Sequence, residues 1–123
     1  MRICLVATLL TGLIGVTGAN AQAKFVNLKM TNGFDKPVTI YVIDHNNDRK
    51  IDENKREISP GGDSTSQAKL DAKDYMEVVF SVKAPGDGRN SGYYCKRVST
   101  SMKDKKEYKE TLSKTSMKEG SSC

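Results

Sequence analysis

The chain has 123 residues, 20 Lys and Arg against 15 Asp and Glu, and a formal net charge of +5. This length allows one domain of ordinary size and leaves no room for a second core. Its residues are 37% hydrophobic and 28% charged, and no tract is of low complexity. That balance excludes a wholly disordered chain and predicts an ordinary globular domain.

The first 23 residues have the parts of an export signal. Arg2 precedes an apolar run from Ile3 to Val16, and small residues follow as far as Ala23. The run is shorter than the roughly twenty residues of a membrane-spanning helix, and small residues precede a signal peptidase cut. We therefore predict a signal peptide over residues 1–23, a single domain over residues 24–123, and a periplasmic or secreted protein with no further membrane contact.

The cysteines support export. Removal of the signal takes Cys4 away and leaves an even pair, Cys95 and Cys123. Exported compartments permit disulfides, so we predict one bond between these two residues. The bond would close a loop of about 28 residues, which the chain-entropy model values at about 3.5 kcal/mol.

Alternation of apolar and polar residues predicts strands for most of the domain. The run from Tyr75 to Lys83 is the clearest, because Met76, Val78, Phe80 and Val82 share one face. In chain order we predict strands over residues 26–31, 38–43, 55–59, 64–70, 75–83 and 92–100, with a long loop over residues 84–92. Such short strands joined by turns rich in Gly and Pro predict an all-β fold, a small antiparallel β-sandwich of immunoglobulin-like or related type. A small barrel is the alternative.

The segment from about residue 102 forms a basic tail. Tyr108 and Leu112 are four residues apart, and Glu110 with Lys114 makes a pair that favours a helix. We predict a short helix over residues 102–115, with an extra strand as the alternative.

The segment from Asp44 to Lys55 has oxygen-bearing side chains at alternating positions. In this it resembles the calcium loop of EF-hand proteins, which presents six to eight oxygens to a hard cation. Arg49 stands where that loop has Gly, and Lys55 stands where it has a bidentate Glu. The alternative is a loop whose Asp and Asn side chains bond their own backbone. The resemblance implies these ligands, the fourth of them through its backbone carbonyl: Asp44, Asn46, Asp48, Lys50 and Asp52.

Residue inventory argues against an enzyme. His45 is the only histidine, and the two cysteines are predicted to bond to each other. A catalytic triad, a cysteine nucleophile or a zinc centre therefore lacks its usual residues. We assign no catalytic residue and no cofactor, unless calcium binds the loop.

A binding role remains, with an unknown protein or surface glycan as partner. The candidate contacts are aromatic residues, which supply binding energy at low entropic cost, and tail lysines: Tyr41, Tyr93, Tyr94, Lys103, Lys105 and Lys106. Burial of the tyrosines at the edge of the core and a solvated charged face are the alternatives for these residues. Export and the absence of stacking motifs argue against nucleic acid. We therefore predict an exported interaction module of inhibitor, immunity, adhesin or effector type. A calcium-stabilised domain and a small cationic toxin are the alternatives.

Overall fold

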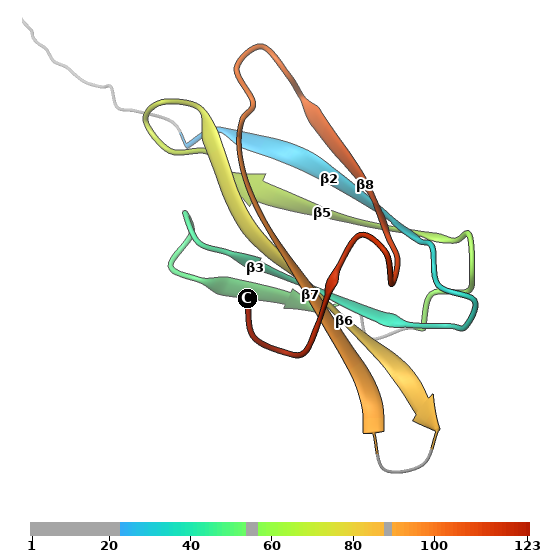
Figure 1. Cartoon of the computed structure of the whole chain (residues 1–123). Helices are drawn as coiled ribbons and strands as arrows, with labels where there is room; N and C mark the ends of the chain where they lie inside the picture. The colour runs from blue at the N-terminus through green and yellow to red at the C-terminus, as the bar shows by residue number, and fades with distance from the viewer. Residues whose placement is uncertain (1–22, 54–56, 88–89) are drawn as a thin grey trace, which may run out of the picture.

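A computed structural model describes residues 23–53, 57–87 and 90–123 of the chain. No helix occurs among these residues, so the predicted all-β class is confirmed. The predicted signal peptide, apart from Ala23, lies outside the described residues. With the labels of Figure 1, the strands are β2 Phe25–Asn32, β3 Thr39–Asp44, β4 Lys50–Glu53, β5 Asp63–Lys69, β6 Tyr75–Asp87, β7 Asn90–Ser101, β8 Glu107–Leu112 and β9 Lys118–Glu119.

The strands form two sheets with a hydrophobic core between them (Figure 1). The smaller sheet has the order β5-β2-β8, and the larger has the order β4-β3-β6-β7-β9. Every second side chain of β2 and β3 is buried, as the alternation of the sequence predicts. The centre of the core combines residues of both sheets, among them Leu28, Met30 and Leu112 from the smaller and Ile40, Met76 and Phe80 from the larger.

Five predicted strands are confirmed, and the third lies elsewhere. We expected it over residues 55–59, but β4 spans Lys50–Glu53 and pairs with β3. Two tight turns reverse the chain early, since Asn47 N–H bonds Asp44 O at 3.1 Å and Lys50 N–H bonds Asn47 O at 3.0 Å. Residues 54–56 lie outside the described residues, and Ile58 forms only a single bridge with Val38.

The predicted loop over residues 84–92 is also wrong. β6 and β7 continue their pairing as far as Asp87 and Asn90. The register shifts between Ala84 and Asp87, and Pro85 falls within this irregular stretch. A bulge of this kind lets a hairpin pass a residue that cannot donate a ladder hydrogen bond.

The predicted helix over residues 102–115 is wrong, and the alternative of an extra strand is correct. Residues Glu107–Leu112 form β8, which lies beside β2 in the smaller sheet. Tyr108 and Leu112 lie four residues apart, a spacing that places them on one face of a helix or of a strand. The β2–β8 pair is parallel, whereas the remaining strand pairs are antiparallel, so the prediction of a purely antiparallel sandwich needs this correction.

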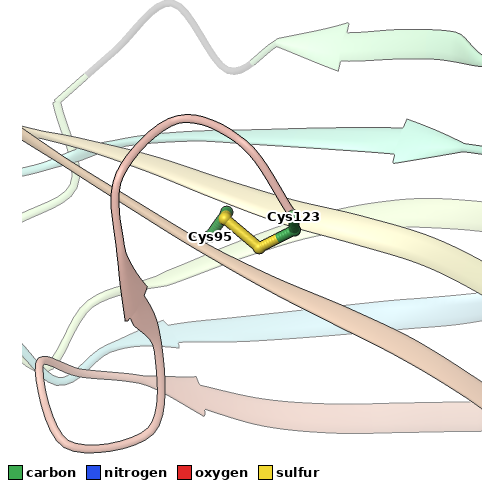
Figure 2. The surroundings of a disulfide bond; sticks show 2 residues. All are labelled: Cys95 and Cys123. Atoms are coloured by element: carbon green, nitrogen blue, oxygen red, sulfur yellow. A yellow bond between two sulfur atoms is a disulfide. The ribbon is translucent and has the colours of Figure 1, made fainter.

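The predicted disulfide is confirmed by the position of its two cysteines (Figure 2). Cys95 is fully buried on β7, and its Cα lies 6.0 Å from that of Cys123. The short strand β9 first pairs with β7, and Gly120, at φ 123°, then turns the chain. The last residues therefore return to Cys95 and cover this part of the outer side of β7.

Candidate functional site

Asp44 is the most buried of the predicted calcium ligands. It ends β3 with its side chain pointing inward and is only 4% exposed. Its Oδ1 accepts a hydrogen bond from Asn46 N–H at 3.2 Å, and its Oδ2 accepts one from Lys69 N–H at 2.8 Å. Both carboxylate oxygens thus bind backbone amides.

Asn46 completes this arrangement from the next turn. Its Nδ2 donates to Lys69 O at 3.0 Å and to Tyr75 O at 2.9 Å. Lys69 and Tyr75 lie where β5 and β6 separate into different sheets, beside the bridge between Leu70 and Met76. Asp44 and Asn46 therefore fasten the β3–β4 turn to the point where the two sheets diverge.

The other predicted ligands do not gather around these two. Asp48, Lys50 and Asp52 are all exposed, and Asp52 accepts a hydrogen bond from Ser66 Oγ of β5. Within residues 23–53, 57–87 and 90–123, no group of three or more His, Cys, Asp and Glu side chains is placed to hold a metal ion. Lys55 lies outside the described residues. Calcium binding stays a prediction.

A cleft of about 630 Å³ lies against the middle of β5. Thr65, Ser66 and Gln67 line it on the β5 side, and Asp52 lines it on the β4 side. Three of the predicted metal ligands, Asp44, Lys50 and Asp52, also border it. This cleft could not be predicted from the sequence, because it depends on the distance between strands of different sheets.

The outer face of the larger sheet carries an aliphatic row. The pairing of β4, β3 and β6 places Ile51 beside Ile43 and Ile43 beside Val79. Ile51 is 60% exposed, Ile43 is half-buried, and Val79 is 7% exposed. Tyr41 lies two residues before Ile43 on the same face of β3. We call Tyr41, Ile43, Ile51 and Val79 the outer patch.

The structure separates the three tyrosines predicted to contact a partner. Tyr41 belongs to the outer patch. Tyr93 lies on the same face of the larger sheet, 38% exposed, with Lys83 Nζ 5.9 Å from the centre of its ring. Tyr94 points to the other face of β7 and packs against Phe34, with ring centres 5.0 Å apart. Tyr94 is therefore part of the edge of the core.

The tail lysines lie far from these tyrosines. Lys103, Lys105 and Lys106 are exposed in the connection between β7 and β8, with Asp104 among them. Tyr93 lies near the other end of β7, about 30 Å away at the usual rise of a strand. Lysines and tyrosines therefore do not form a single contact surface.

A polar network between the sheets escaped the sequence analysis. Lys96 Nζ of β7 lies 2.9 Å from Glu110 Oε2 of β8, and Tyr108 O–H donates to Glu110 Oε1 at 2.6 Å. The Tyr108 ring stacks on Phe80 of the larger sheet, with ring centres 6.2 Å apart. Burial raises the pKa of the Tyr108 phenol, and the bond to Glu110 raises it further. This network joins β7 to β8 across the core.

Comparison with known proteins adds no assignment. No protein-family model matches the chain, and neither the curated proteins nor the solved structures give a match. In the part of the chain that the structure describes, no helix is long and apolar enough to cross a membrane.

Proposed function

We propose that this protein is an exported, non-catalytic binding module whose outer patch docks a protein partner. The pair of Ile51 and Ile43 carries the proposal, because it presents an exposed and a half-buried aliphatic side chain on two adjacent strands of an outer sheet face, with the buried Val79 beside Ile43 on the third strand. The solvent face of an antiparallel sheet is ordinarily polar. Contiguous exposed apolar surface rimmed by polar groups is typical of protein contact sites.

The chemistry of the outer patch favours a protein over a glycan. Branched aliphatic side chains fit the apolar side chains of another protein, whereas a sugar needs planar stacking surface and many hydrogen-bonding groups. The ion pair between Arg97 and Glu77 lies beside Val79 and supplies a polar rim. Rims of this kind surround the apolar centre of protein interfaces. The alternative of a small cationic toxin has less support, because the acidic Asp104 lies among the lysines of the tail.

The architecture gives further support. Two facing sheets with a hydrophobic core between them agree with a relationship to immunoglobulin-like sandwiches, which we retain as part of the proposal. The disulfide differs in its place, because it joins β7 to the C-terminal segment on the outer side of the larger sheet. Sandwiches of this kind hold binding residues on a rigid frame.

The proposal is tested by photocrosslinking from position 51. A crosslinking residue in place of Ile51 is used to identify the contacting protein in the exported fraction of the source cells. That protein is then purified, and its affinity is measured by calorimetry for the wild type, for Ile51→Glu and for the control Lys73→Glu, which lies on the exposed β5–β6 turn.

We expect Ile51→Glu to weaken binding at least tenfold, because a charge would have to be desolvated in an apolar contact. Lys73→Glu should bind like the wild type, and all three proteins should unfold at similar temperatures. Equal affinity of wild type and Ile51→Glu would refute the outer patch as the docking surface. Specific binding of oligosaccharides in place of a protein would refute the choice of partner.

A further inference from the structure

We infer that two copies of this chain pair through β5, in antiparallel orientation, with the two-fold axis at Thr65. The inference rests on the edge of the smaller sheet and is independent of the outer patch, which lies on the larger sheet.

The free edge of β5 follows from its ladder with β2. Leu70 N–H bonds Lys24 O at 2.8 Å, and Asn32 N–H bonds Gly62 O at 2.9 Å. Hydrogen-bonded pairs alternate along an antiparallel ladder, so the even-numbered residues of β5 bond to β2. The odd-numbered residues direct their N–H and C=O groups away from β2.

Side chains cover one end of this edge. Lys69 N–H donates to Asp44, and Lys69 C=O accepts from Asn46, so these two side chains take the place of a neighbouring strand. Among the described residues, no such partner meets the backbone groups of Asp63, Thr65 and Gln67.

The other sheet edges are less suited to pairing. β4 has four residues and β9 has two. β8 carries charges at Glu107, Lys109 and Glu110, and charged side chains protect an edge from pairing. β5 has seven residues, and only Asp63 and Lys69 at its ends are charged.

The positions of the unpaired backbone N–H and C=O groups on β5 favour a second copy of the chain as the partner and determine the pairing register. Asp63, Thr65 and Gln67 are centred on Thr65, so antiparallel self-pairing satisfies all three from each copy. Thr65 then faces Thr65 of the second copy, and Asp63 faces Gln67 of the second copy. Lys69 lies diagonally opposite Asp63 of the second copy, within reach of a long side chain. Charge complementarity thus favours this arrangement, whereas a parallel one would place the two Asp63 carboxylates together.

Hydrogen bonds within each copy already orient the side chains of Asp63 and Gln67, which would meet in the dimer. Thr31 Oγ1 donates to Asp63 Oδ1 at 2.7 Å, and Gln67 Nε2 donates to Asn27 Oδ1 at 3.3 Å. An amide nitrogen has two hydrogens, so Gln67 keeps one for Asp63 of the second copy. A continuous hydrogen-bonded row would then cross the interface.

The test uses sedimentation equilibrium of the purified protein over a range of concentrations. The wild type should show a monomer–dimer equilibrium. Thr65→Lys should raise the dimer dissociation constant at least tenfold, because it places two like charges directly opposite each other. Thr65 is exposed, so this change leaves the core intact. The control Thr111→Lys lies exposed on β8, at the opposite edge of the sheet, and should dimerise like the wild type.

A mixture decides the register. Thr65→Glu alone should also be weakened tenfold, whereas an equimolar mixture of Thr65→Lys and Thr65→Glu should form a heterodimer more tightly than either variant self-associates. A wild type that is monomeric at all concentrations, undiminished dimerisation of Thr65→Lys, or no gain in the mixture of the two folded variants would each overturn the inference. Ile51→Glu should leave the dimer unchanged, which separates this result from that of the proposed function.

Discussion

Arg49 adopts a backbone conformation that is unfavourable for a residue with a side chain. Its φ is 58°, and that of Asp48 before it is 55°. The left-handed conformation costs a residue with a Cβ roughly 1–2 kcal/mol, and glycine avoids this at some cost in entropy. We expect Arg49→Gly to raise the free energy of unfolding by about 0.5–1 kcal/mol, and the melting temperature by on the order of 4 °C.

Calorimetry checks this, with Lys73→Gly as the control, because the φ of Lys73 is not positive. The control should be less stable than the wild type. Destabilisation by Arg49→Gly would show that the arginine side chain makes a contact worth more than the backbone cost.

Tyr108 should ionise at a higher pH in the folded protein than in the unfolded chain. Burial and the bond to Glu110 favour its neutral form in the folded protein, so its folded pKa lies above its unfolded pKa of about 10. As the pH rises above 10, the unfolded state loses this proton first, and the free energy of unfolding falls. Absorbance at 295 nm follows the ionisation of phenols and should show a late step for Tyr108.

Tyr108→Phe tests the assignment. It should remove the late step of the titration and lessen the loss of stability above pH 10. A late step that persists in the variant would assign it to another tyrosine.

The sequence pattern singled out Asp44 and Asn46, but it did not decide whether they bind a metal ion or bond the backbone of a turn. Residues two apart with side-chain oxygens suit a metal loop and also suit a turn that bonds backbone amides. The contacts of Asp44 with Lys69, 25 positions away, come only from the fold. Likewise, the choice among Tyr41, Tyr93 and Tyr94 needed the register of β3 and β7, which alternation alone leaves open.

At the scale of an element, Asp44 should stabilise the β3–β4 turn whether or not calcium is present. Asp44→Ala leaves two amides without their acceptor, and a buried unsatisfied donor costs about 1–3 kcal/mol. We expect a loss of about 2–4 kcal/mol in EDTA as well as in 1 mM calcium. Asp48→Ala, at an exposed position, should have little effect.

Thermal unfolding in the two solutions separates the two roles. A site with a dissociation constant near 10 μM would stabilise the wild type by about 2.7 kcal/mol in 1 mM calcium. If that gain appeared and Asp44→Ala abolished it, the loop would be a cation site after all.

Strands with strong alternation could be predicted, and those defined by tertiary contacts could not. β2, β3 and β6 bury every second residue along a clear pattern. β4 has only four residues and lies within a segment rich in polar side chains. β8 has a spacing that fits a helix as well as a strand, so packing of Leu112 against the core decided its conformation.

For the whole molecule, the disulfide should supply a large share of the stability. It closes a loop of 28 residues that includes β8 and β9. Replacing both cysteines by alanine should lower the free energy of unfolding by about 3.5 kcal/mol, chiefly by freeing the unfolded chain. Urea titration measures this loss, and reduction of the wild type should give a similar value. A loss below about 1 kcal/mol in both experiments would contradict the expectation.

The all-β class and the disulfide could be predicted from composition, alternation and the number of cysteines. The order of the strands in the sheets could not. Asn27 of β2 pairs with Gln67 of β5 and with Glu107 of β8. Partners so far apart leave no local signal, and the parallel pair lacks the hairpin turn that reveals an antiparallel one.

The central place of β2 has a consequence for how the chain assembles. The smaller sheet needs one strand from the beginning of the domain, one from the middle and one from near its end, so about 80 residues separate Asn27 from its last partner. Pairing over such distances is slow, and a chain that lacks β8 cannot complete this sheet. Under the proposed export this delay would be useful, because a polypeptide that is slow to close its smaller sheet stays extended for longer while it is threaded across a membrane.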